Sequence, residues 1–322
     1  MPTPLLPQEI HLLERYSSKT YFDAMRTAWE QMLQHAEASL EAFVGRLPLD
    51  YRSRPLPEQP DIVWGERVLP NLRNTAEALN NAYIQLTHGE IQALGTSGLI
   101  QSDFSGFSRD YSATWMDEPQ VVERVGGGSA VFWKWLALAL QHAANIEFTV
   151  GAYWKKGDLG VRYDPIARGA LEGPTQWTRY SLSKTRTATT DEVVTETGIY
   201  LPLLDASCAA FMIEGALAPP ASIGYDPETM QNVSEMACTW ILVERTTENN
   251  VEDGLSDLLG DNEIRIRRQK AGQECPRSGW WHTPARSESR HYFNKGDVFP
   301  SFEEDYGDTL WQWAQNQESP KL

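Results

Sequence analysis

The feature that most constrains the fold is a long apolar stripe between Thr20 and Val44. Its apolar side chains recur at three- and four-residue steps, at Phe22, Met25, Trp29, Met32, Ala36, Leu40 and Phe43. That spacing places them on one face of an α-helix. Thr20 followed by Asp23 resembles a capping pair, and Gly45 stands where a helix commonly ends. The sequence therefore predicts a long amphipathic helix that buries one face against a neighbour.

Two further helices are predicted in the first half of the chain. The first begins near Pro70, a residue tolerated in a first helical turn, and closes at His88 and Gly89. Its heptad-like apolar pattern favours an antiparallel pair with the 20–44 helix. The other helix, at 129–144, is apolar nearly all round and is expected to be buried on most sides. The glycine run at 126–128 before it indicates a tight helix start, because it lacks the lysine of a phosphate-binding loop.

The pattern changes near residue 146. Apolar and polar residues alternate from Ile146 to Trp154, which predicts a half-buried strand, and a hairpin partner is expected at 159–163. The apolar segment 238–243 is predicted to be a strand, whereas 208–213 is compatible with strand or helix.

Together these patterns predict an α+β fold. A mostly α-helical domain is expected at 1–145, packed against a mainly antiparallel sheet with helices at 146–322. No repeat occurs at the period of solenoids or propellers.

Composition narrows the function class. The net charge is −16, from 44 acidic and 28 basic residues, which repels nucleic acid and anionic lipid and attracts basic partners. The N-terminal residues do not resemble a secretory signal, and no apolar run has the length of a membrane span, so a cytoplasmic protein is expected. The three cysteines, Cys208, Cys238 and Cys275, form no CxxC pair, which gives no support to a disulfide framework.

Motifs for catalysis are missing from the sequence. It contains neither an HExxH zinc motif nor a GxSxG nucleophile elbow. Cys275, His282 and His291 lie within one short segment, but their spacing matches no standard zinc knuckle. We therefore expect a binding protein without enzymatic activity, cofactor or metal.

The segment from Glu274 to Pro300 is the most distinctive part of the chain. Two adjacent tryptophans follow Gly279, arginines alternate with aromatic residues, and Pro284 interrupts any helix or central strand. Guanidinium groups stack on aromatic rings, so this pattern predicts a rigid surface built from loops. We expect its aromatic residues to be mainly structural.

This segment and the C-terminal end resemble the immunity proteins of bacterial polymorphic toxin and type VI secretion effector systems. The resemblance is carried by CPRSGWWHTPA at 275–285, SRHYF at 289–293, Gly296-Asp297 and DYGDTLWQW at 305–313. The motif residues expected to be structural are Cys275, Gly279, Trp280, Trp281, Pro284, Arg290, Tyr292, Phe293, Gly296, Asp297, Trp311 and Trp313.

The resemblance implies that the protein binds a cognate toxin domain and blocks its active site. Nuclease toxins are a frequent target of such proteins, and surfaces that hold phosphates are basic, so an acidic inhibitor would complement them. Two clusters of carboxylates flank the motif. The residues expected to contact the toxin are Glu248, Glu252, Asp253, Asp257, Asp261, Glu303, Glu304, Asp305 and Asp308.

Two other functions are compatible with the sequence. Its 12 tryptophans would suit a carbohydrate-binding or carbohydrate-processing protein that uses aromatic rings as sugar platforms, although the N-terminus does not resemble a secretion signal. An adaptor that delivers effectors to a secretion apparatus is the other alternative.

Overall fold

The computed structural model describes residues 3–47, 49–109, 111–171, 178–204, 207–224, 234–246, 268–283, 289–301 and 309–313. It is about 49% helix and 18% strand, with helices first and antiparallel sheets after them, which confirms the predicted α+β class. The chain forms two compact units, Met1–Thr247 and Glu248–Leu322. In the described part, no helix is long and apolar enough to cross a membrane.

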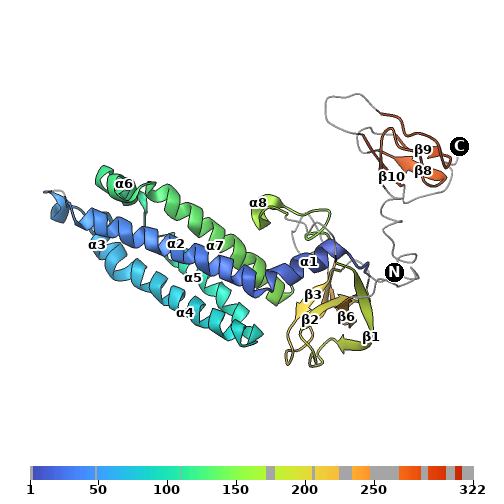
Figure 1. Ribbon diagram of the computed structural model, residues 1–322, viewed down its shortest axis with the longest axis horizontal. Helices are drawn as coiled ribbons and strands as arrows, with labels where there is room; N and C mark the ends of the chain where they lie inside the picture. Colours follow the sequence, from blue (N-terminus) through green and yellow to red (C-terminus); the bar gives the residue numbers. More distant parts are fainter. Residues whose placement is uncertain are drawn as a thin grey trace. The chain divides into compact units, whose positions relative to one another are not determined.

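Among the described residues, the α-helices belong to the first unit (Figure 1). They are α1 (Pro7–Tyr16), α2 (Lys19–Val44), α3 (Pro60–Val63), α4 (Leu69–Thr87), α5 (Gly98–Phe107), α6 (Pro119–Val125), α7 (Gly128–Gly151) and α8 (Pro165–Arg168). The predicted helices at 20–44 and from Pro70 are confirmed as α2 and α4. The cap of α2 was placed wrongly, because the side chain of Ser18 rather than Thr20 accepts the hydrogen bond from the backbone N–H of Tyr21.

Helix α2 is the central element of the helical body. It packs against α7 and α4, and α4 runs antiparallel to it, as predicted (Figure 1). The indole N–H of the buried Trp29 on α2 donates to the carbonyl oxygen of Leu72 on α4 at 3.1 Å. A buried hydrogen bond of this kind fixes the register of the two helices, since breaking it leaves polar groups without partners.

The predicted strand from Ile146 to Trp154 is wrong. Helix α7 continues to Gly151, so the expected domain boundary near 145 falls inside it. Ile146 and Thr149 are buried, whereas Phe148 is 41% exposed, which follows a helical period of three to four residues. The expected hairpin partner at 159–163 forms turns instead. The alternating pattern was too short to distinguish a strand from the end of a buried helix.

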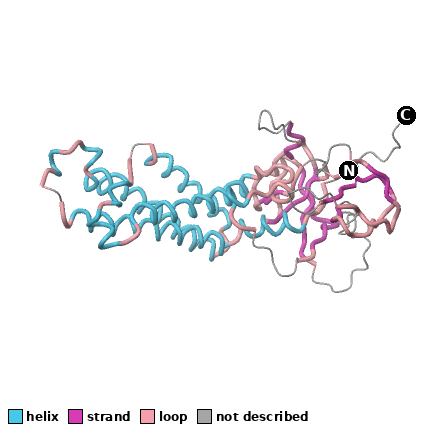
Figure 2. The backbone as a smooth tube through the Cα atoms, turned by 90° about the horizontal axis from the view of Figure 1, so that it is seen from above, coloured by secondary structure: helices cyan, strands magenta, loops and turns pink. Residues whose placement is uncertain are grey.

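Strands begin after the helical body. They are β1 (Tyr180–Thr189), β2 (Gly198–Pro202), β3 (Ala210–Met212), β4 (Ala221–Ile223), β5 (Ser234–Met236), β6 (Thr239–Arg245), β7 (Arg268–Lys270), β8 (Gly279–His282), β9 (His291–Phe293) and β10 (Leu310–Trp313). The predicted strand at 238–243 is confirmed as β6, and the ambiguous segment 208–213 contains strand β3. Figure 2 shows the strands of both units in magenta.

The two units contain the same four-stranded antiparallel sheet. The strand order is β1-β6-β2-β3 in the first unit and β7-β10-β8-β9 in the second. We call these sheets, with their connecting turns, the first and the second β module. Their registers also agree, because Gly198 pairs with Met212 as Gly279 pairs with Phe293. The chain therefore carries two copies of one fold.

Equivalent hydrogen bonds support this correspondence. The indole N–H of Trp240 in the first module donates to the carbonyl oxygen of Pro219 at 2.9 Å, and Trp311 donates to Pro300 at 2.8 Å. Isolated bridges link Val193 to Leu217 and Glu274 to Val298 in the same place. Such agreement in turns and side-chain contacts goes beyond a shared strand order.

Candidate functional site

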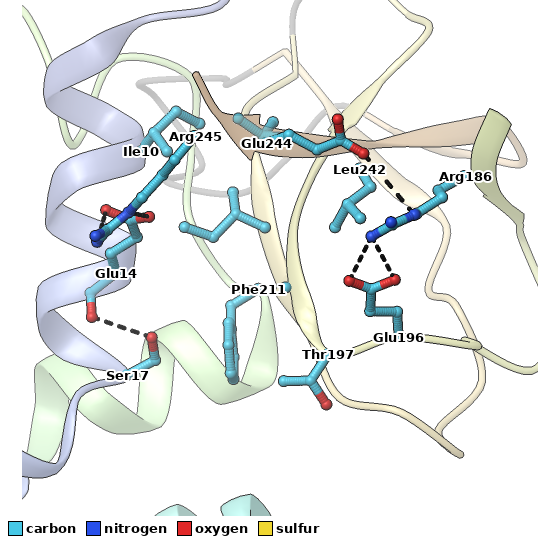
Figure 3. Close-up of a pocket in the computed structure, with 13 residues that line it drawn as sticks. Ile10, Glu14, Ser17, Arg186, Glu196, Thr197, Phe211, Leu242, Glu244 and Arg245 are labelled. Atoms are coloured by element: carbon cyan, nitrogen blue, oxygen red, sulfur yellow. Dashed lines mark hydrogen bonds and ion pairs between the residues drawn. The ribbon is translucent and has the colours of Figure 1, made fainter. Parts of the chain in front are cut away.

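A polar groove lies where α1 meets the first β module, and Figure 3 shows its lining. Its volume is about 280 Å³. Apolar side chains of α1 and of strands β2, β3 and β6 form its floor, and an arginine–glutamate pair lies at each end. The lining includes Ile10, Glu14, Arg186, Glu196, Ile199, Phe211, Leu242, Glu244 and Arg245.

One pair fastens α1 to the sheet. Both guanidinium nitrogens of Arg245 that face Glu14 donate to its carboxylate oxygens at 2.8 Å. The hydroxyl of Tyr180 donates to the same carboxylate at 2.8 Å. Burial of this hydroxyl, together with its bond to the Glu14 carboxylate, raises the pKa of Tyr180. The Glu14 carboxylate is therefore satisfied by two residues of the sheet.

The second pair closes the other end of the groove. One guanidinium nitrogen of Arg186 lies 2.7 and 2.8 Å from the two carboxylate oxygens of Glu196, and Glu244 lies 3.8 Å from the same guanidinium group. The groove therefore holds three carboxylates and two guanidinium groups, and each carboxylate lies beside a guanidinium group. Its geometry suits a structural joint rather than an active site.

A buried carboxyl group lies on the next turn of α1. Glu9 is 4% exposed, and its side chain accepts a hydrogen bond from the backbone N–H of Ala209 at 2.6 Å. Burial, with a smaller contribution from the charge of Asp158, raises the pKa of Glu9 to about 7. Cys208 is also buried, and its thiol donates to the carbonyl oxygen of Trp154 at 2.9 Å. Because substrate cannot reach these groups, we assign them to packing between α1 and β3.

The helix start at the glycine run already holds a carboxylate. Asp117 accepts hydrogen bonds from the backbone N–H of Ser129 at 2.8 Å and from its hydroxyl at 2.7 Å. Gly127 precedes α7 with a φ of 73°, a conformation that favours glycine. The side chain of Asp117 therefore occupies the position that an external anion would need.

The second β module has an aromatic core. Cys275, Trp281, Phe293, Phe299 and Trp311 form one buried cluster. The ring centroids of Phe293 and Phe299 are 4.8 Å apart, and those of Phe293 and Trp311 are 4.9 Å apart. Tight packing of large rings supplies the small module with much of its buried apolar area.

The opposite face of this module carries a second aromatic pair. Trp280 and Tyr292 are directly opposite on β8 and β9, and their rings meet edge to face with centroids 5.6 Å apart. The guanidinium carbon of Arg290 lies 4.8 Å from the centre of the Trp280 ring. Tyr292 is 46% exposed. We call Trp280, His282, Arg290 and Tyr292 the aromatic face of the second module.

The remaining motif residues shape a turn. Gly296 has a φ of 93°, and the Asp297 side chain accepts a hydrogen bond from the backbone N–H of Asn294 at 2.6 Å. Pro284 lies outside the described residues, as does the side chain of Trp313. Of the residues considered for zinc, Cys275 is in the core of the second module. His282 on β8 and His291 on β9 lie on opposite faces of the sheet, because His291 pairs with Trp281. Within the described ranges, no group of three His, Cys, Asp or Glu residues could hold a metal.

Every acidic residue expected to contact a toxin lies outside the described residues. This applies to both clusters, which comprise Glu248, Glu252, Asp253, Asp257, Asp261, Glu303, Glu304, Asp305 and Asp308. Sequence reasoning missed the paired groove residues, since Glu14 and Arg245 are far apart in the chain. It also missed the outward position of Trp280, although adjacent residues of a strand must point to opposite faces.

Comparison with known proteins gives no further identification: no family model, curated protein or solved structure matches the chain.

Proposed function

We propose that this chain is an immunity protein of the bacterial cytoplasm that binds a cognate secreted toxin domain and occludes its active site. The observation that carries the proposal is the division of the motif aromatics into two sets. Trp281, Phe293 and Trp311 are buried in the core of the second module, whereas Trp280 and Tyr292 lie on its opposite face. The second set is not part of that core, and Tyr292 is 46% exposed.

The composition of this face supports protein binding. Tryptophan, tyrosine and arginine dominate the energetic centres of protein interfaces, because they combine large contact area with polar groups. The aromatic face contains each of these three residue types. One acidic cluster precedes the second module in the sequence, and the other lies between β9 and β10. Both are proposed to meet a basic surface of the toxin.

The geometry gives less support to sugar binding. A sugar platform requires an open, flat ring, but the Trp280 and Tyr292 rings are inclined by 77°. The Arg290 guanidinium also lies over the Trp280 ring. We therefore prefer a protein partner to a carbohydrate.

Co-production with the toxin domain encoded by the adjacent gene tests the proposal. We expect the two proteins to elute from a size-exclusion column as one complex, and the bacterial host to grow when it makes both. Growth arrest in spite of this protein, or separate elution of the two chains, would refute an immunity function. A host that makes the toxin domain alone provides the control for toxicity.

A further inference from the structure

A cleft with both polar and apolar walls opens in the helical body of the first unit. It lies between the N-terminal end of α4 and helix α5, which pack against each other (Figure 1). Its volume is about 370 Å³, within the range of small-molecule sites in proteins. We call it the α4–α5 cleft, and its walls include Arg67, Asn71, Leu72, Asp103, Gly106 and Phe107.

A π-helical turn forms one side of the cleft. The chain is π-helical from Trp64 to Val68 and continues as α4 from Leu69. Trp64 is buried, and its indole N–H donates to the carbonyl oxygen of Ser112 at 3.0 Å. Single π turns are rare and occur frequently at functional sites. This turn anchors Trp64 in the core, while Arg67, three residues further on, lines the cleft.

The cleft has a base on one side and an acid on the other. Arg67 and Asn71 are four residues apart on the α4 side, and Asp103 belongs to α5. Within the described part of the chain, the side chains of Arg67 and Asn71 form no hydrogen bond or ion pair. By comparison, Arg26 on α2 and Arg73 on α4 are each paired with a carboxylate. The guanidinium group of Arg67 therefore keeps its full capacity to bind an anion.

The protein satisfies only one side of the Asp103 carboxyl group. Its Oδ2 atom accepts a hydrogen bond from the hydroxyl of Thr75 on α4 at 2.7 Å. No donor from the described residues reaches the other oxygen. Partial burial, opposed by the bond from Thr75, raises the pKa of Asp103. A cation in the cleft would supply the interactions that this partly desolvated carboxylate lacks.

The floor of the cleft is apolar. Leu72 is 1% exposed and Phe107 is 5% exposed, and both belong to the main core. A Cβ atom added to Gly106 would meet no atom within 4 Å, so there is free space beside α5 at this point. An apolar floor between groups of opposite charge suits a ligand that has an apolar body and both charges.

We propose that the α4–α5 cleft binds a small zwitterion with an apolar body, namely an amino acid or a dipeptide. The carboxylate of the ligand is bound by Arg67 and Asn71, and its ammonium group is bound by Asp103. Its apolar part covers Leu72 and Phe107. The inference is independent of the proposed immunity function, because it is argued from the first unit alone.

Isothermal titration of the full chain with the dipeptide leucyl-phenylalanine tests the inference. Two matched probes each lack one charge: the N-acetyl dipeptide has no ammonium group, and the dipeptide amide has no carboxylate. We expect the dipeptide to bind about tenfold or more tightly than either analogue, because each analogue loses a charge-assisted hydrogen bond. Free phenylalanine is the smaller probe of the same class.

Two variants assign the two charges. Asp103→Asn should weaken binding of the dipeptide and of its amide about tenfold or more, but not binding of the N-acetyl form. Arg67→Gln should weaken binding of the dipeptide and of the N-acetyl form, and leave the amide unchanged. Glu77→Gln and Arg46→Gln remove exposed charges outside the cleft and are the matched controls. Because Arg67 is exposed, its variant keeps the test valid even where Asp103→Asn fails to fold.

A third variant fills the space without a change of charge. Gly106→Leu should fold, since the added Cβ atom meets nothing within 4 Å, and should abolish binding of the dipeptide. If neither the dipeptide nor phenylalanine binds the natural chain at millimolar concentration, the inference is wrong. Binding that Asp103→Asn and Arg67→Gln leave unchanged would also overturn it. Equal affinity of the natural chain for all three dipeptide probes would exclude a zwitterion as the ligand.

Discussion

The buried carboxyl group of Glu9 makes the stability of the first unit depend on pH. The pKa of Glu9 is about 7 in the folded chain against an ordinary value of 4.5, because burial in the contact with β3 favours the protonated form. Between these two values the unfolded chain releases a proton that the folded chain retains. The stability that protonated Glu9 contributes is therefore fully present below pH 4.5 and is lost as the pH rises through 7.

The size of this effect follows from the two pKa values. Each tenfold difference in proton affinity corresponds to about 1.4 kcal/mol, which gives about 3 kcal/mol for the whole titration. About 2 kcal/mol of that loss falls between pH 5.5 and 8.5, since the unfolded carboxyl group is already ionised at the lower limit. Glu9→Gln cannot ionise, and its amide oxygen can still accept the hydrogen bond from Ala209.

We expect urea unfolding of the first unit to reveal this difference. The free energy of unfolding of Glu9→Gln should gain about 2 kcal/mol relative to the natural chain between pH 5.5 and 8.5. Repulsion within a chain of net charge −16 also changes with pH, but it acts on both proteins. Glu77→Gln, which removes an exposed carboxylate on α4, should run parallel to the natural chain. Parallel curves for Glu9→Gln as well would refute the reasoning.

Two other properties can be predicted from the structure. Trp240→Phe and Trp311→Phe each remove an indole N–H from a proline carbonyl oxygen, so each should destabilise its own module by about 1–2 kcal/mol. Hydrogen exchange of the β6 and β10 amides would measure this, and a loss confined to one variant would contradict the equivalence of the modules. Cys208, Cys238 and Cys275 are buried, and burial raises the pKa of each thiol. The native chain at pH 8 should therefore react with an aromatic disulfide reagent far more slowly than the unfolded chain, and rapid labelling of any one thiol would disprove this.

Periodicity in the sequence was sufficient to predict the main helices of the first unit, but not the C-terminal end of α7. The stripe from Phe22 to Phe43 is long enough for a period of three to four residues to be unmistakable. From Ile146 to Trp154 the same chain offers only two helical turns, and their residues happen to alternate in polarity. Burial by neighbouring helices then decides the structure, and that information is not local.

The repeated module was not detectable as a sequence repeat. Gly198 and Gly279 are identical at matching strand starts, and a Cβ atom at Gly198 would lie 2.6 Å from the side chain of Leu242. Trp240 and Trp311 keep the same hydrogen bond. The other matched core positions carry different residues, with phenylalanine in place of Met212 and Ala218, tryptophan in place of Tyr200 and cysteine in place of Val194. These changes preserve burial but remove the sequence similarity. The aromatic face could have been predicted in part, because Trp280 and Trp281 are adjacent and adjacent residues of a strand point to opposite faces.

The contrast between the two cores also limits how the chain can misfold. Sheets of the same fold within one polypeptide could exchange strands during folding, which is a common failure of tandem domains. Here the position of Ala218 in the first core is taken by Phe299 in the second, and that of Met212 by Phe293. A strand inserted into the wrong sheet would leave a void in one module and overcrowd the other. Each defect would lower the free energy of unfolding by about 1 kcal/mol or more. Divergence at Met212 and Phe293 thus disfavours an exchange of β3 and β9 between the two sheets.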